Sequence, residues 1–78
     1  MPTLLRSGPY RVYFFSHEPN EPPHVHVDRD DSTCKFWLLP VALARNVGFP
    51  ARELARIERL IQQQLLFLLE AWNDHFGS

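Results

Sequence analysis

Two histidines separated by one residue are the first feature of the sequence with the potential for chemistry. His24 and His26 follow two consecutive prolines in residues 20–30, NEPPHVHVDRD. The alternation of this segment predicts a β-strand, with Val25 and Val27 on one face and the two histidines on the other. Side chains two residues apart on one strand lie about 7 Å from each other, so both imidazoles can reach one ligand.

The histidine pair fits three functions, which the residues alone leave open. As general acid and general base, the two histidines can cleave a phosphodiester such as RNA, with Arg11 or Lys35 holding the phosphate. As metal ligands, His24, His26 and Asp28 can bind a divalent ion such as zinc. As polar residues on the wetter face of a sheet, they can instead lie at an interface with a partner. A His-x-His pattern arises easily by chance, so we expect neither a metal nor a cofactor.

Strands rich in aromatic residues flank the histidine segment. Residues 10–16 (YRVYFFS) and 33–40 (TCKFWLLP) contain the aromatic and β-branched residues that strands favour, and residues 2–6 can add a short first strand. Three prolines make residues 17–23 a loop. The first part of the chain, residues 1–40, is therefore predicted to form an antiparallel β-meander of three to four strands.

The second part of the chain, residues 41–78, predicts helices. Residues 41–46 (VALARN) favour a short connecting helix that ends near Gly48. Pro50 suits the first position of a long helix. Apolar residues then recur at steps of three and four along one stripe: Leu54, Ile57, Ile61, Leu65, Leu68, Trp72 and Phe76. The predicted fold is a single α+β domain over residues 1–78, with the meander packed on one long C-terminal helix.

One helix can cover only one face of such a sheet, so the other face is expected to be open. Alternation divides the aromatic residues into two sets, one containing Tyr13, Phe15 and Trp37 and the other containing Tyr10, Phe14 and Phe36. Exposed aromatic residues beside arginine and lysine are typical of interface hot spots. The residues expected to bind a partner are Glu21, Arg11, Lys35, Trp37, Tyr13 and Phe15.

The expected long helix carries a second apolar surface. About 26 residues would make it about 40 Å long, which is about twice the length of a six-residue strand. Within residues 65–69 (LLFLL), Leu66 and Phe67 point away from the sheet when the neighbouring leucines face it. We therefore expect Leu66 and Phe67 to contact a partner chain.

Composition and charge narrow the classes of function. The net charge of the 78 residues is −1 and gives no strong field for nucleic acid, so a protein partner or a homodimer is favoured over RNA. Cys34 is the only cysteine, which excludes an internal disulfide and fits a cytoplasmic protein. It lies in the middle of a strand without an evident base, so we do not expect it to be a nucleophile. The sequence shows neither a membrane-spanning segment nor a signal peptide.

Four segments that cover nearly the whole chain carry a resemblance to a known family. These segments are MPTLLRSGPYRVYFFSHE, NEPPHVHVDRD, KFWLLPV and GFPARELARIERLI. They resemble the small prokaryotic family called domain of unknown function 4160. The resemblance implies no reaction. What it implies is a genomic context, in which the adjacent gene encodes another small uncharacterised protein and the two form a toxin–antitoxin-like pair. The motif positions that it implies are Glu21, His24 and His26, followed by Arg11, Lys35 and Trp37.

Overall fold

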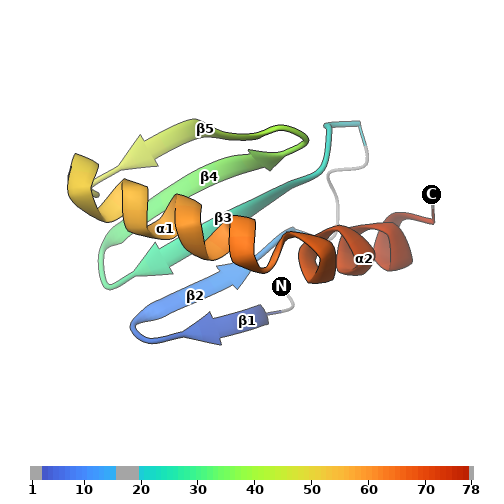
Figure 1. Cartoon of the computed structure of the whole chain (residues 1–78), viewed down its shortest axis with the longest axis horizontal. Coiled ribbons are helices and arrows are strands. Elements are labelled where there is room, and N and C mark those ends of the chain that lie inside the picture. Colours follow the sequence, from blue (N-terminus) through green and yellow to red (C-terminus); the bar gives the residue numbers. More distant parts are fainter. Residues whose placement is uncertain (1–2, 16–19, 78) are drawn as a thin grey trace.

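A computed structural model describes residues 3–15 and 20–77, and these residues form one antiparallel sheet with helices on one side of it (Figure 1). The strands are β1 (Thr3–Ser7), β2 (Tyr10–Tyr13), β3 (His24–Arg29), β4 (Ser32–Leu38) and β5 (Val41–Val47), and the helices are α1 (Ala51–Gln63) and α2 (Leu65–Phe76). Each strand pairs with the next, in the order β1-β2-β3-β4-β5. The predicted α+β class is confirmed. Residues 17–19 of the predicted loop lie outside the described residues.

The segment predicted to form a short helix is instead strand β5. Alanine, leucine and arginine favour helices locally, and this preference underlies the helix that the sequence predicts at residues 41–46. Pairing with β4 from Leu38 back to Thr33 overrides this local preference, because it satisfies the backbone hydrogen bonds of the whole segment. The sheet therefore has five strands rather than three or four, and it extends to Val47 instead of ending at residue 40.

A bulge at Ala44 determines which side chains of β5 face each side of the sheet. Two consecutive residues of β4, Lys35 and Phe36, pair with residues of β5 that are two apart, Arg45 and Leu43. Ala44 is the extra residue between them. Because side chains alternate along a strand, this extra residue turns Arg45 to the same face as Lys35, whereas regular pairing would direct it toward α1.

The bulge also positions the residue that leads into α1. Asn46 follows Arg45 and therefore faces the helix side of the sheet. Its side-chain amide donates a hydrogen bond of 2.9 Å to the Phe49 carbonyl, and its side-chain oxygen accepts one of 3.1 Å from the Phe49 N–H. These two bonds close the turn between β5 and α1.

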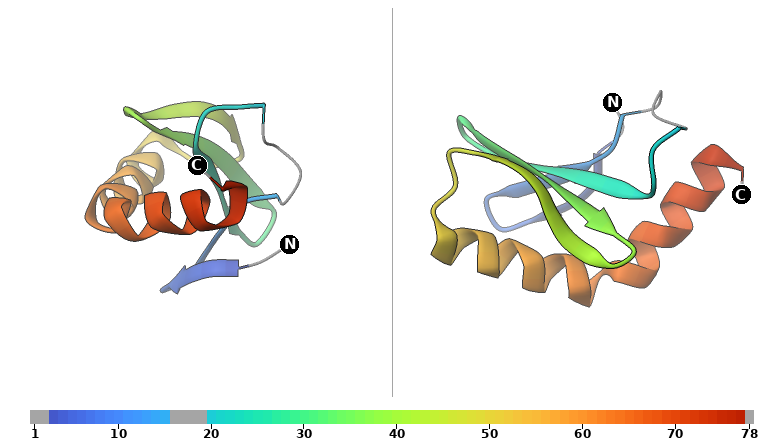
Figure 2. Two further views of the ribbon diagram at one scale, coloured as in Figure 1. Left: turned by 90° about the vertical axis from the view of Figure 1, so that its right-hand side faces the viewer. Right: turned by 90° about the horizontal axis from the view of Figure 1, so that it is seen from above.

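Figure 2 shows both helices on one side of the strands. The hydrophobic core lies between the sheet and these helices. Its fully buried members include Val12, Val25, Val27, Phe36, Leu38, Ile57, Ile61 and Leu68. The strand residues in this set alternate with residues of the other face. Val25 and Val27 share one face, as predicted, and it is the face toward the helices. The helical residues follow the predicted stripe at steps of three and four.

The predicted long helix is interrupted at Gln64. This residue has φ −107° and ψ 15°, ends α1 and precedes α2. Its N–H donates to the carbonyls of Leu60 and Ile61 at 3.1 and 3.2 Å. Beyond it, α2 turns away from the direction of α1 and rises past the end of the sheet (Figure 2). The helical segment therefore wraps the end of the sheet instead of overhanging it. Neither α1 nor α2 is long and apolar enough to cross a membrane.

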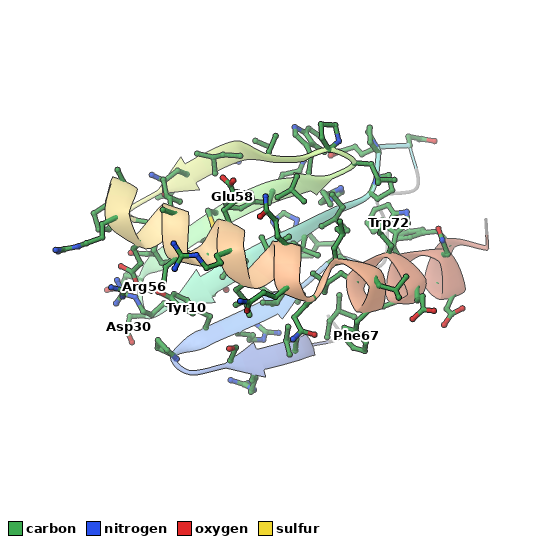
Figure 3. All side chains as sticks on the ribbon, viewed as in Figure 1. Tyr10, Asp30, Arg56, Glu58, Phe67 and Trp72 are labelled. Atoms are coloured by element: carbon green, nitrogen blue, oxygen red, sulfur yellow. The ribbon has the colours of Figure 1, made fainter. Side chains whose placement is uncertain are left out.

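An ion pair fastens the far end of β3 to the first turn of α1. Arg29 donates from Nε and Nη2 to the carboxylate of Glu53, with an Nη2–Oε1 distance of 2.8 Å. The hydroxyl of Tyr10, labelled in Figure 3, donates to the same carboxylate at 2.9 Å. These hydrogen bonds, that of Arg29 first, hold the pKa of Glu53 below its usual value. Sheet and helix are thus linked through one ionised carboxylate.

Replacement of this carboxylate by Glu53→Gln is expected to weaken the acid dependence of unfolding. A depressed pKa in the folded state means that the stabilisation is complete above the unfolded pKa of 4.5 and is lost as the pH falls through the folded pKa. The urea midpoint of the unchanged protein should therefore fall more steeply between about pH 5 and pH 3 than that of the variant. Glu58→Gln, which removes an exposed carboxylate of α1, should keep the original slope. Equal slopes for Glu53→Gln and the unchanged protein would contradict this role.

Candidate binding site on the open sheet face

The sheet face opposite α1, called the open face below, carries a row of polar and aromatic side chains across four strands. Tyr13, His26, Lys35 and Arg45 are directly paired neighbours on β2, β3, β4 and β5. Directly paired residues of antiparallel strands share a face, with Cβ atoms about 5 Å apart. The row therefore brings a phenol, an imidazole, an ammonium group and a guanidinium group together.

A pocket of about 590 Å³ lies over this row, within the size range of ligand sites. Its lining residues are Tyr13, Phe15, Glu21, His26, Thr33, Cys34, Lys35, Trp37, Ala44 and Arg45. Five of the six residues predicted to bind a partner are in this set, and Arg11 is not. The aromatic set predicted to contain Tyr13, Phe15 and Trp37 is thus the one on the open face.

Aromatic rings enclose His26 on this face. The ring of Tyr13 stacks on the imidazole at a centroid distance of 5.4 Å and an interplanar angle of 21°. Phe15 meets the imidazole edge-on, with centroids 4.6 Å apart. His26 is half-buried between these rings, so its orientation is constrained while it still lines the pocket.

The two cations of the row, Lys35 and Arg45, differ in whether a carboxylate neutralises their charge. The ammonium group of Lys35 pairs with the carboxylate of Glu21 and lies 4.6 Å from the centroid of the Trp37 ring. Arg45 is exposed, and it has no ion-pair partner among the residues that the structure describes. The pocket therefore has one compensated cation and one uncompensated cation side by side.

A second polar network, centred on Asp28, lies beside the pocket. The carboxylate of Asp28 accepts hydrogen bonds from the Tyr13 hydroxyl at 3.0 and 3.1 Å and from the Thr33 hydroxyl at 2.7 Å. The guanidinium of Arg11 lies 4.0 Å from Asp28 and 4.5 Å from the centroid of the Tyr13 ring. Burial, and then the hydrogen bond to Asp28, raise the pKa of Tyr13. Arg11 thus supports Tyr13 and Asp28 rather than lining the pocket.

His24 shares the open face with His26 but is completely buried. The rings of Trp72 in α2 and Trp37 lie at centroid distances of 5.0 and 5.7 Å from its imidazole. Its Nδ1 lies 2.9 Å from the carbonyl of Pro22, which can only accept, so Nδ1 carries a proton. Figure 3 labels Trp72 on α2, the helix that wraps this end of the sheet. His24 therefore packs between two indoles, and of the two histidines only His26 lines the pocket.

The polar residues around the histidines do not converge on one point. Across residues 3–15 and 20–77, no group of three or more His, Cys, Asp and Glu side chains is placed to hold a metal ion. Asp28, which the sequence offers as a third ligand, is engaged by Tyr13 and Thr33 instead.

Sequence reasoning missed four residues that line the pocket, Thr33, Cys34, Ala44 and Arg45. Ala44 and Arg45 lie in the segment that the sequence predicts to be helical, where no strand face is expected. The alternation of Thr33 with Lys35 and Trp37 was a usable signal for Thr33, since all three belong to one face of β4. No comparable signal marks Arg45, because the bulge breaks the alternation of β5.

The pocket lies within the part of the chain that matches a family model. Residues 10–73 match the model described as Domain of unknown function (DUF4160). The chain belongs to this family. The matched region contains every lining residue of the pocket, and the predicted resemblance is confirmed. Neither the comparison with curated proteins nor the comparison with solved structures found a match.

The second predicted contact surface of this DUF4160 chain lies away from the pocket. Leu66 and Phe67, in the first turn of α2, are 73% and 45% exposed. Leu68 is buried in the core, and Leu66, two residues before it at about 100° per residue, points nearly the opposite way. Figure 3 labels Phe67 below the ribbon at the start of α2. The open face and this apolar pair are therefore two separate surfaces.

The single cysteine of this DUF4160 chain should be unreactive while the fold is intact. Burial, and then the charge of Asp28, raise the pKa of Cys34 to about 12. At pH 8 its thiolate fraction is then roughly a thousandfold lower than that of a thiol with a pKa of 9.0. Labelling by an aromatic disulfide reagent should accelerate by at least about a hundredfold in concentrated urea.

An exposed thiol provides the control for this measurement. Asp31→Cys places a second cysteine in the exposed turn before β4, and that thiol should react at the rate of a free cysteine in the folded protein. Fast labelling of Cys34 in the folded, unsubstituted protein would show that the thiol is ionised and accessible, against the structure.

Proposed function

We propose that this chain is a protein-interaction module that binds its partner through the open face of the sheet. The observation that supports this most directly is the grouping of Tyr13, Phe15 and Trp37 with Lys35 and Arg45 around one pocket. Aromatic residues and arginine are enriched at the centres of protein interfaces. Because α1 and α2 pack on the other face of the sheet, the open face is available to bind a partner.

The partner that we propose is a second small protein of the same bacterial cytoplasm, in a two-component, toxin–antitoxin-like pair. The ground for this partner is the genomic context that the family resemblance implies, in which the adjacent gene encodes another small protein. The size of the chain supports it as well, since a domain of 78 residues buries a limited fraction of its surface alone. A second copy of the chain is the alternative partner, whereas the net charge of −1 does not favour nucleic acid.

The apolar pair Leu66 and Phe67 is proposed as a second contact of the same module. Both side chains are exposed on the outer side of α2, where the core of the chain does not cover them. Because this surface is separate from the open face, the two contacts can be removed one at a time.

This function predicts that a substitution on the open face weakens partner binding without unfolding the chain. Phe15 is 38% exposed, so Phe15→Ser should leave the circular dichroism spectrum intact. It should weaken the complex with the product of the adjacent gene by about tenfold or more in titration calorimetry, as for a hot-spot residue. Leu66→Ser is the matched substitution on the second surface.

Two results would decide against this function. The first is a purified protein that stays monomeric at tens of micromolar and binds no product of an adjacent gene. The second is a complex that tolerates Phe15→Ser and is lost only with Leu66→Ser, which would transfer the interface from the open face to α2.

His26 supports a second candidate function, the cleavage of an RNA phosphodiester. Its imidazole lines the pocket in the same row as two cations that can hold a phosphate, Lys35 and Arg45. The 2′-hydroxyl of RNA would be the nucleophile, so the protein needs no nucleophilic side chain. Because His24 is buried, this function depends on His26 for proton transfer.

The ribonuclease function predicts growth arrest when the chain is expressed without its neighbour. His26→Ala should relieve the arrest, because it removes the proton-transfer group. His75→Ala, which alters an exposed histidine of α2, should not relieve it. Harmless expression of the unchanged chain at high level would rule out this function.

A further inference from the structure

The pocket contains a pair of like charges that a bound carboxylate would neutralise. Lys35 and Arg45 face each other directly across β4 and β5 on the open face. Like charges at directly opposite positions destabilise a sheet. Glu21 binds Lys35, so the charge of Lys35 is compensated, whereas Arg45 has no counter-charge within residues 3–15 and 20–77. The free protein therefore bears an electrostatic cost at this position that an incoming anion would remove.

The bulge of β5 indicates that this pairing is a built feature of the sheet. Regular pairing of β5 with β4 would have turned Arg45 toward α1 and away from the pocket. The bulge prevents this by leaving Ala44 unpaired, so that Arg45 stays opposite Lys35, and bulges commonly re-aim a side chain next to a functional site. Both Ala44 and Arg45 line the pocket.

The surroundings of the two cations restrict the kind of anion. The rings of Phe15 and Trp37 line the same pocket, so the group that carries the charge meets apolar walls. The carboxylate of Glu21 already occupies the Lys35 side, which shows that a carboxylate fits there. Lys35, Arg45 and Glu21 together carry a net charge of +1, which one singly charged carboxylate neutralises, whereas a dianionic phosphate would leave an excess of negative charge.

We propose that the pocket receives an aspartate or glutamate side chain that the partner presents next to an apolar or aromatic residue. Arg45 provides the main charge contact through the paired N–H groups of its guanidinium, with Lys35 beside it. Phe15 and Trp37 contact the adjacent apolar side chain. This inference rests on the proposed protein-interaction function, and it adds the chemistry of the group that is recognised.

A pair of blocked dipeptides tests the recognised group without knowledge of the partner. The titration of ¹⁵N-labelled protein with acetyl-Phe-Glu-amide should shift the Arg45 side-chain N–H and the Trp37 indole N–H. Acetyl-Phe-Gln-amide, of equal shape but no charge, should bind about tenfold more weakly, the usual effect of one charge-assisted contact. Arg45→Gln should reduce the affinity for the glutamate dipeptide to that of the glutamine dipeptide. Arg52→Gln, on α1, should leave both affinities unchanged.

Three outcomes would overturn the inference. They are equal affinity for the two dipeptides, unchanged affinity in Arg45→Gln, and tighter binding of acetyl-Phe-phosphoserine-amide than of the glutamate dipeptide. The first would show that the charge of the ligand does not affect binding, and the second that Arg45 does not contribute to it. The third would show that phosphate is the preferred anion.

The failure of this inference can be told apart from the failure of the proposed function. If Phe15→Ser abolishes the partner complex and Arg45→Gln does not weaken it, the recognition of a carboxylate is wrong but the protein-interaction function stands. Charge-dependent binding of the dipeptide by a protein that forms no complex at all supports the specificity of the pocket and contradicts the proposed function.

Discussion

The structure depends on a constraint of coverage: two helices on one side can bury only one face of a five-stranded sheet. The side chains of each strand therefore divide into a set that enters the core and a set that must find other partners. On the open face, these side chains contact one another. Tyr13 stacks on His26, Lys35 lies over Trp37, and Asp28 gathers hydroxyl groups from two strands. The chemistry-bearing residues are concentrated there because the core excludes them.

Alternation is the part of this arrangement that the sequence predicts well. In each strand with a clear period of two, alternation predicts which side chains share a face, because a shift by one residue would bury charges and expose the core. Val25 and Val27 thus face the helices, and His26, Lys35 and Trp37 face the pocket. The apolar stripe along the helices is predicted on similar grounds, because residues that recur every three or four positions lie on one face of a helix and are buried together.

The features that escaped prediction are those that contacts distant in sequence decide. Residues 41–46 have local helix preference, and only the edge of β4 makes them a strand. The break at Gln64 lies in a run of three glutamines without proline or glycine, and it matches the place where the sheet ends rather than a local signal. The burial of His24 follows from that break, because α2 carries Trp72 around the end of the sheet. Alternation predicts the face of a residue but not whether a later segment covers it.

The extra residue of β5 also affects how the chain tolerates changes of length in evolution. Deleting Ala44 would leave Leu43 opposite Phe36 and Arg45 opposite Lys35 in a regular ladder, so each side chain would keep its face. Inserting one further residue between Leu43 and Arg45, with the same single bulge, would shift the pairing of everything that follows by one residue, so that the guanidinium enters the helix layer and Asn46 leaves Phe49. Such an insertion would alter recognition and the start of α1 together. Insertions in the turn at Asp30 and Asp31 have no such double effect, because that turn is exposed. Among related chains, an insertion in β5 is therefore a marker of altered binding specificity, whereas an insertion in that turn is not.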